Sequence, residues 1–365
     1  VESIRPSHHG KELRTSIDLR IQYLAYRTLK AAIQRYSAES GSIVILDVKT
    51  GEILAIVNQP TYNPNDRAQF SAERYRNRAI TDIFEPGSSI KPLVVAAALE
   101  SGDYRPSSIV DTAPGFVVVG PKEIKDSRNL GRISLTTILA RSSNVGVTKL
   151  AMSLQPDQLW TTMTRFGLGT LTSSGFPGES AGLLTHFNHW RPINQATLAY
   201  GYGVSVTPLQ LAQAYSVLGS DGVFRPISLV ALDSSPEGDQ VMAAESAAAV
   251  RRMLEEVVRP GGTGTKAAVA GYRIAGKTGT AWKFAAGGYS QDKYISIFAG
   301  LAPASDPRLA AVVVIDEPAG ELYYGSDVAA PVFADVMAES LRLLAIPPDA
   351  MPARDPGSII QAMSQ

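Results

Sequence analysis

The chain contains the stretch Glu85-Pro86-Gly87-Ser88-Ser89-Ile90-Lys91-Pro92-Leu93-Val94-Val95-Ala96-Ala97-Ala98-Leu99-Glu100, in which a helix-start pattern leads into a long apolar run. Residues three apart share one helix face, so the amine of Lys91 is expected beside the hydroxyl of Ser88. A serine hydroxyl is a weak nucleophile, but a buried lysine has a lowered pKa and can accept the serine proton. The stretch therefore predicts a buried helix that holds a nucleophilic Ser88 at its N-terminus, and acyl transfer without histidine.

A second Ser-x-x-Lys occurs at Ser290-Gln291-Asp292-Lys293. It follows Gly287-Gly288-Tyr289, which is typical of a loop, and no apolar periodicity comes after it. We therefore take Ser88 and not Ser290 as the candidate nucleophile.

Two further motifs are Ser142-Ser143-Asn144 and Lys277-Thr278-Gly279-Thr280, and each has a second copy in the chain. Lys49-Thr50-Gly51 lies between two apolar runs, which predicts a hairpin over residues 42–58 with Gly51 in the left-handed conformation. Ser127-Arg128-Asn129 lies in a polar stretch that favours a turn. Both second copies are interpreted as structural.

Taken alone, Ser142 and Asn144 favour a helix terminus, where serine and asparagine are common caps. The order Ser-x-x-Lys, Ser-x-Asn, Lys-Thr-Gly is the set found in penicillin-binding proteins and class A β-lactamases. The chain resembles the penicillin-binding transpeptidases, and three further segments resemble the class B enzymes: 14–22, 201–210 and 323–333. The resemblance covers roughly residues 14–346, and within class B residues 298–303 and 316–318 most resemble the cell-division branch, the penicillin-binding protein 3 group.

Periodicity predicts strands near both ends of the chain and helices between them. Ser16 is expected to cap a first helix, and strand-like runs return after the hairpin at 273–275, 294–299 and 309–315. The helices between them are expected at 92–100, 134–154, 156–166, 194–200, 208–218 and 245–257. If the first and last strands pair, the middle of the chain is a helical lobe with a cleft beside the sheet. The resemblance implies the same α/β fold of the α+β type, a central antiparallel sheet flanked by helices with an inserted all-helical lobe.

The resemblance also implies roles for the motif residues. Ser88 is the nucleophile, Lys91 the favoured acylation base, and Ser142 a proton relay; Asn144 bonds Lys91 and the substrate, and Lys277 supplies positive potential. The hydroxyls of Thr278 and Thr280 are expected to hold a terminal carboxylate, with Gly279 leaving space beside the nucleophile. The oxyanion donors are expected to be the backbone N–H groups of Ser88, near a helix start, and of Thr280.

Strand alternation places Lys277 and Gly279 on one face and Thr278 and Thr280 on the other, so the site is expected along the strand's edge, where an extended peptide can pair with it. Tyr323 and Tyr324 are candidates for the cleft wall by resemblance, although aromatic pairs equally suit a core. Trp282 departs from the family, which commonly has a polar or basic residue there.

The implied function is a peptidoglycan D,D-transpeptidase that forms a Ser88 acyl-enzyme with D-Ala-D-Ala stem peptides, cross-links septal cell wall and is acylated by β-lactams. A β-lactamase or D,D-carboxypeptidase is the alternative, but no carboxylate near the motifs is an evident base for activating water. The hypothesis from a different class of protein is a non-catalytic β-lactam sensor or division-complex scaffold. Nothing in a scaffold requires the four intact motif residues Ser88, Lys91, Ser142 and Lys277, which counts against it.

Composition narrows the possibilities further. The chain has 365 residues, 45% of them hydrophobic, and a net charge of zero, which gives no electrostatic case for nucleic acid. There is no cysteine, so disulfides and thiol chemistry are excluded. His186-x-x-His189 has no acidic or cysteine neighbour and suits packing better than a metal, so neither metal nor cofactor is expected.

We expect residues 1–15 to be a linker or the remnant of a preceding non-catalytic domain, 16–346 the transpeptidase domain, and 347–365 a tail. By resemblance the domain is periplasmic or otherwise extracytoplasmic, and it belongs to a protein anchored in the inner membrane by a helix outside this chain. Division-complex membrane proteins are the expected partners, through regions outside this chain.

Overall fold

The structure is a computed structural model that describes residues 10–66, 71–285 and 288–350. Its centre is a five-stranded sheet of order β11-β12-β13-β1-β2 in which every neighbouring pair is antiparallel. The strands are β1 (Ser40–Asp47), β2 (Ile53–Gln59), β11 (Ala275–Ala285), β12 (Gly288–Ala302) and β13 (Leu309–Asp316). The register of β1 on β13 pairs Val44 with Val312, so the predicted pairing of the first and last strands is confirmed.

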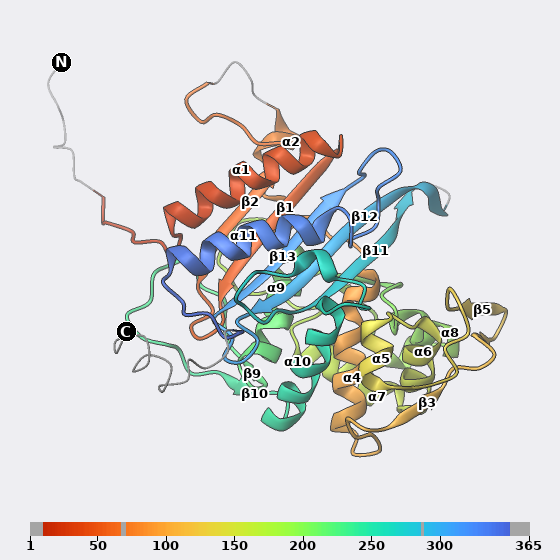
Figure 1. The fold of residues 1–365 in the computed structure, drawn as a ribbon. Helices are drawn as coiled ribbons and strands as arrows, with labels where there is room; N and C mark the ends of the chain where they lie inside the picture. The colour runs from red at the N-terminus through yellow and green to blue at the C-terminus, as the bar shows by residue number, and fades with distance from the viewer. Residues whose placement is uncertain (1–9, 67–70, 286–287, 351–365) are drawn as a thin grey trace, which may run out of the picture.

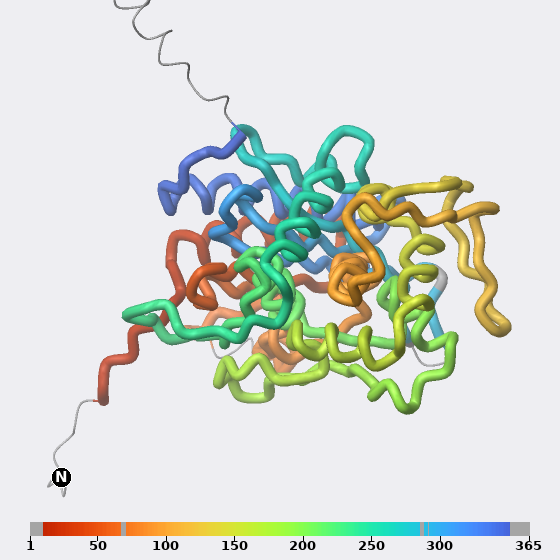
Figure 2. Tube along the Cα trace, turned by 90° about the horizontal axis from the view of Figure 1, so that it is seen from below, coloured from red at the N-terminus to blue at the C-terminus, as the bar shows by residue number. Residues whose placement is uncertain are grey.

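Helices cover both faces of this sheet. Figure 1 shows α1 (Leu19–Arg35) and α11 (Ala329–Leu343) across one face, with the helices of the middle of the chain, among them α4 to α10, on the opposite side. Figure 2 shows the same division, with the red and blue terminal segments apart from the yellow and green helices. The lobe and its connections contain α4 (Lys91–Glu100), α5 (Leu135–Ala140), α6 (Asn144–Ser153), α7 (Pro156–Arg165), α8 (Pro192–Leu198), α9 (Pro208–Gly219) and α10 (Ala244–Val258).

Short elements complete the description. Before α4 lie α2 (Ala72–Tyr75), α3 (Arg78–Thr81) and the 3-10 turn η2 (Gly87–Ile90); two further 3-10 turns are η3 (Phe187–His189) and η4 (Thr265–Ala267). Four two-stranded ribbons pair β3 (Ile109–Asp111) with β6 (Arg132–Ser134), β4 (Phe116–Val119) with β5 (Lys122–Lys125), β7 (Leu183–Leu184) with β8 (Val204–Ser205), and β9 (Val223–Phe224) with β10 (Asp239–Gln240).

Two apolar cores lie on the two faces of the sheet. Alternation along β1 sends Val44 and Leu46 into the core shared with the lobe, and Ile43 and Ile45 into the core under α1 and α11. A strand buried on both faces needs a continuous apolar run, which explains the sequence Ile43-Val44-Ile45-Leu46.

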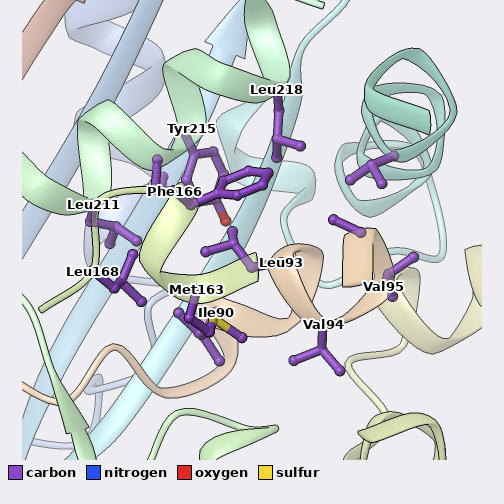
Figure 3. Packing of buried hydrophobic residues seen from close by; sticks show 14 of the residues in the cluster. Ile90, Leu93, Val94, Val95, Met163, Phe166, Leu168, Leu211, Tyr215 and Leu218 are labelled. Carbon is purple, nitrogen blue, oxygen red and sulfur yellow. The ribbon is translucent and has the colours of Figure 1, made fainter. Parts of the chain in front are cut away.

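The lobe core surrounds α4, which is buried on every side from Lys91 to Ala98. Figure 3 shows Leu93 of α4 packed among Met163 and Phe166 at the end of α7 and Tyr215 of α9. The Tyr215 hydroxyl donates to the carbonyl oxygen of Ser89 at 2.8 Å. Because truncating such a buried side chain typically costs about 2–5 kcal/mol, this core fixes the start of α4 firmly.

Three local predictions were wrong. The expected helix over 134–154 is two helices, α5 and α6, because Ser142 adopts a left-handed φ of 57° between them. Helix α1 is capped by the Asp18 carboxylate, which accepts from Arg20 N, whereas the Ser16 hydroxyl donates to Ile53 O. Ser290 lies in strand β12 and not in a loop, and its hydroxyl donates to Asp292 while Lys293 pairs with Glu317.

The proposed ends of the domain remain predictions. Residues 1–9 and 351–365 lie outside the described residues. Of the described remainder, Thr15 bridges to Val230, and the Asp349 carboxylate accepts from Arg273 N and Ser305 N. Among the residues the structure describes, none of the helices combines the length and apolar character required to span a bilayer.

Candidate active site

The turn that carries Ser88 is fixed by backbone packing. Ser88 lies in η2, directly before Lys91, the first residue of α4. Gly87 has a φ of 51°, and a β-carbon there would lie 2.9 Å from the carbonyl oxygen of Thr280 on β11. Only glycine accommodates both the conformation and the approach, so the turn sits directly against the strand of the third motif.

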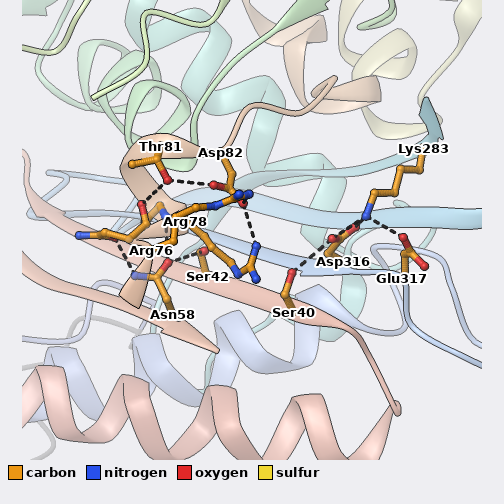
Figure 4. A network of polar contacts seen from close by, with 12 residues as sticks. Ser40, Ser42, Asn58, Arg76, Arg78, Thr81, Asp82, Lys283, Asp316 and Glu317 are labelled. Atoms are coloured by element: carbon orange, nitrogen blue, oxygen red, sulfur yellow. Dashed lines mark hydrogen bonds and ion pairs between the residues drawn. The ribbon is translucent and has the colours of Figure 1, made fainter. Parts of the chain in front are cut away.

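The segment that leads into this turn is tied to the sheet by Asn58 of β2, which donates to Asn77 Oδ1 at 2.7 Å and accepts from Ala79 N at 2.8 Å. Figure 4 shows Asp82 accepting from Arg76 at 2.5 Å and from Arg78 at 3.0 Å, and Lys283 bridging Asp316 and Glu317. A cavity of about 520 Å³ separates the two groups. Phe84 and Val206 exchange two backbone hydrogen bonds. The segment is therefore also held at a position four residues before Ser88.

Lys91 is fully buried and held by the second motif. Its Nζ donates to Ser142 O at 2.6 Å, to Asn144 Oδ1 at 2.6 Å and to Ser142 Oγ at 3.2 Å. Burial lowers the pKa of Lys91 well below its usual value, the positive charge of Lys277 lowers it further, and Asp126 opposes both. The fold thus places an amine with a lowered pKa between the first and second motifs.

The loop that presents Ser142 is held by Asp126, a residue that the sequence analysis missed. One Asp126 oxygen accepts from Asn144 N at 2.6 Å and Val145 N at 3.1 Å, and the other accepts from the Ser143 hydroxyl at 2.5 Å. Ser143 in turn caps α6 by accepting from Gly146 N. Helix capping and presentation of Ser142 toward Lys91 are therefore properties of the same loop.

Strand β11 separates the residues of the third motif as its alternation requires. Lys277 points to the lobe side and is fully buried, which lowers its pKa to about 7. On the other side Thr278 donates to the Thr263 hydroxyl at 3.2 Å, and the Thr280 hydroxyl accepts from Gly325 N at 2.9 Å. Gly279 is packed tightly, since a β-carbon would lie 2.8 Å from Pro86 O.

The free edge of β11 faces the cleft. Trp282 N donates to the Tyr202 hydroxyl at 3.3 Å, away from β12. Because backbone groups two residues apart on a strand point the same way, the N–H groups of Thr280 and Thr278 point to this edge as well.

The three motifs line one cleft of about 620 Å³. Tyr324 belongs to its wall, whereas Tyr323 stacks on Tyr294 with ring centroids 4.0 Å apart and packs against Tyr324. Ser127 and Arg128 also reach the cleft, although their motif was interpreted only as a turn. The lining residues are Ser88, Asp126, Ser127, Arg128, Leu130, Arg141, Ser142, Asn144, Thr263, Thr278, Thr280, Tyr324 and Ser326.

The remaining second copies and the histidine pair lie elsewhere. Gly51 has a φ of 79° in the turn between β1 and β2, as the hairpin requires. His186 stacks on Phe187 and packs against Trp160. Within 10–66, 71–285 and 288–350, no three His, Asp or Glu side chains are grouped so that they could hold a metal.

Comparison with known proteins gives relatives over nearly the whole chain. Residues 41–338 match the family described as "Penicillin binding protein transpeptidase domain". The chain is 46% identical over 354 residues to peptidoglycan D,D-transpeptidase FtsI of Escherichia coli K12, covering 97% of this chain and 60% of that protein. It is 43% identical over 340 residues to the probable peptidoglycan D,D-transpeptidase PenA of Neisseria meningitidis serogroup A, covering 93% of this chain and 58% of that protein. The chain thus spans about three fifths of the length of these curated relatives.

A solved structure agrees with the fold. The transpeptidase domain of penicillin-binding protein 3 from Burkholderia pseudomallei, solved without ligand, matches with a TM-score of 0.86 and 40% identity, covering 94% of this chain and all of that one. The predicted fold class is therefore confirmed, and this chain belongs to the penicillin-binding protein transpeptidase family.

Proposed function

We propose that the chain is the catalytic domain of a peptidoglycan D,D-transpeptidase that forms an acyl-enzyme on Ser88. The observation that carries this proposal is the buried Lys91 amine, held at 2.6 Å from Asn144 and 3.2 Å from the Ser142 hydroxyl beside the cleft that Ser88 lines. Burial lowers the pKa of this amine well below that of an exposed lysine, so it gives up its proton more readily and can accept one from Ser88. FtsI and PenA, the relatives named above, carry the same activity in their names.

Acylation begins when Ser88 Oγ attacks the carbonyl carbon of the D-Ala-D-Ala amide and its proton passes to Lys91. The oxyanion is stabilised by the N–H groups of Ser88 and Thr280, each worth roughly a hundred- to thousandfold in rate. Ser142, hydrogen-bonded to Lys91, then delivers the proton to the leaving nitrogen. The C–N bond breaks, D-alanine leaves, and the donor peptide stays on Ser88 as an ester.

Transfer repeats the sequence in reverse with an amine from a second stem peptide. The amine attacks the ester carbonyl and loses a proton to Lys91 through Ser142. The C–O bond breaks, Ser88 Oγ recovers its proton, and a new amide links the two peptides. A β-lactam follows only the first half, because its ring opens without releasing a leaving group.

The terminal carboxylate of the donor is held at the third motif. Thr278 and Thr280 present hydroxyls to the cleft, and Lys277, buried behind them, adds positive potential when protonated. An extended peptide that pairs with the free edge of β11 has its scissile carbonyl beside Thr280.

A hydrolase is the alternative within enzymes, since water could replace the amine. Asp126 is the one carboxylate among the described residues that line the cleft. Both of its oxygens already accept hydrogen bonds, from Ser143, Asn144 and Val145. Asp126 is therefore poorly placed to activate water, which favours transfer over a β-lactamase or D,D-carboxypeptidase. A non-catalytic sensor or scaffold would have no use for a buried Lys91 beside Ser88.

The likeness to a penicillin-binding protein 3 structure supports a proposal about the wider role. We propose a part in septal cross-linking, in an extracytoplasmic domain of a protein anchored in the inner membrane, with division-complex membrane proteins as partners outside this chain. The proposed transpeptidase domain runs over 16–346.

Intact-protein mass spectrometry after incubation with a penicillin tests the site. One adduct is expected, located by digestion on Ser88, and Ser88→Ala should remove it while leaving the melting temperature within a few degrees. Ser290→Ala is the matched control and should label fully. An adduct that persists in Ser88→Ala refutes the assignment.

Turnover separates transfer from hydrolysis. With a chromogenic cephalosporin in excess, we expect a burst of one equivalent per protein followed by a flat or very slow phase in absorbance. Steady consumption of many equivalents per second would favour the β-lactamase instead.

A further inference from the structure

We propose that four aromatic residues beside the cleft form a surface on which the sugar rings of the glycan strand stack. This aromatic platform consists of Tyr202, Trp282, Phe284 and Tyr289. The inference rests on the proposed function, since it concerns the part of the substrate that lies beyond the stem peptide.

The platform is contiguous, and three of its four rings are exposed while Tyr202 is half-buried. Phe284 is 68% exposed, Trp282 48% and Tyr289 43%, which is unusual for large aromatic side chains. Ring centroids lie 5.4 Å apart for Phe284 and Tyr289, 5.3 Å for Tyr202 and Tyr289, and 6.3 Å for Tyr202 and Trp282. Neighbouring exposed rings of this kind mark a binding surface.

Hydrogen bonds hold two members of the platform in place. The Tyr202 hydroxyl accepts from Trp282 N at 3.3 Å, and the Tyr289 hydroxyl donates to Glu85 Oε1 at 3.0 Å. Glu85, which lies three residues before Ser88, also accepts from Gly203 N at 2.7 Å. The rings are therefore preorganised, so a ligand would lose little side-chain entropy by ordering them.

The direction of the donor peptide leads to the platform. Its carboxylate lies at Thr278 and Thr280 and its scissile carbonyl lies at Thr280, so the peptide runs antiparallel to β11, with its N-terminal part toward Trp282. Trp282 lies on the same side of β11 as the two threonines, as alternation requires. An extended peptide rises about 3.3 Å per residue. From Thr280, the few residues of a stem peptide therefore reach the far end of the hairpin formed by β11 and β12, where the attached sugar begins.

The chemistry of the platform suits carbohydrate. The face of an aromatic ring carries partial negative charge, which attracts the weakly positive C–H groups on one side of a pyranose ring. The Tyr202 and Tyr289 hydroxyls supply polar groups at the ring edges for sugar hydroxyls. Trp282 lies two residues after Thr280 on β11, so the platform begins next to the strand residues that line the cleft.

The test compares two donors on the purified chain: a synthetic disaccharide-pentapeptide and the same pentapeptide without sugar, with one amine acceptor. We expect the disaccharide to raise kcat/KM by about three- to tenfold, as one or two ring contacts would. In Phe284→Ala the ratio of the two kcat/KM values should fall toward one. Phe284→Trp should restore it, and Tyr23→Ala, which removes an aromatic 62% exposed on α1, should leave it unchanged.

A binding measurement tests the platform without an acylation step. Calorimetric titration of the Ser88→Ala protein with amidase-treated glycan oligomers, which lack peptide, should show saturable binding that Trp282→Ala abolishes and Tyr23→Ala preserves. Equal kcat/KM for the two donors in the wild type, or glycan binding unaffected by Trp282→Ala, overturns the platform. So does platform-dependent binding of phosphatidylcholine vesicles in place of glycan. Failure of every donor to acylate Ser88 would instead refute the proposed transpeptidase.

Discussion

The α-carbon of Gly201 packs so closely against Gly87 that a β-carbon on Gly201 would lie 2.1 Å from the Gly87 carbonyl oxygen. Gly87 N also donates to Gly201 O at 3.3 Å. Since Gly87 immediately precedes Ser88, the loop after α8 fixes the position of the turn that carries Ser88.

Gly201→Ala should therefore displace this turn and lower the rate of penicillin acylation at least tenfold. Two effects combine, because the φ of 90° costs an alanine about 1–2 kcal/mol and the added carbon overlaps the turn. Gly203→Ala is the control for strain alone, since its φ is 78° but its β-carbon would have no neighbour nearer than 3.9 Å. Acylation equally slowed in both variants would rule out a role of the Gly201 packing in positioning Ser88.

Lys91→Arg should slow acylation by orders of magnitude. A guanidinium stays protonated at ordinary pH and cannot accept the Ser88 proton. The measurement is the second-order rate of adduct formation by mass spectrometry, with Lys149→Arg as the control, because Lys149 is half-buried and its amine donates to Asp111 O. Acylation near the wild-type rate in Lys91→Arg would shift the base assignment to another group.

Asp126→Asn should change both the size and the pH dependence of the acylation rate. Losing charge-assisted bonds to Asn144 N and the Ser143 hydroxyl loosens the loop, which we expect to cost about tenfold or more at the alkaline plateau. Asp126 raises the pKa of Lys91, so its removal lowers that pKa and moves the acidic limb of the profile to lower pH. Asp111→Asn, on the exposed strand β3, is the control. A lower plateau with an unmoved limb would limit Asp126 to a structural role.

Lys277→Met should stabilise the protein near neutral pH while impairing acylation. Burial lowers the pKa of Lys277 from 10.5 to about 7, so between these values the unfolded chain binds more protons than the native one and stability rises with pH. The cost of burying this lysine is therefore fully present below pH 7 and fades as pH approaches 10.5. The methionine variant should melt several degrees higher than wild type at pH 6.5, with the difference shrinking by pH 10. An exposed replacement, Lys11→Met, should show no such trend; a constant difference for Lys277→Met would contradict the lowered pKa.

Local pattern was enough for several of the elements and for the motifs. Apolar runs of strand length predicted β1, β2 and β13, and the apolar stretch after Lys91 predicted α4. A strand buried on both faces, or a helix buried on every side, requires an uninterrupted run of apolar residues, which is visible in the sequence. The three motifs could be found because each is a few residues long. Their second copies were set aside from their neighbours alone, although Ser127 and Arg128 turned out to line the cleft.

Tertiary structure decided what depends on residues distant in sequence. Asp126 has no local pattern, and its role exists only because the ribbon of β4 and β5 lies beside α6. The break at Ser142 interrupts a sequence with good helical periodicity, since contacts to Lys91 and Asp126 outweigh the modest preference of those residues for helix. The lowered pKa values of Lys91 and Lys277 likewise come from burial, which arises when the lobe closes on the sheet. Sequence thus determined which chemical groups are available, and packing determined their distances and their charge, because burial and hydrogen bonding are properties of the assembled fold.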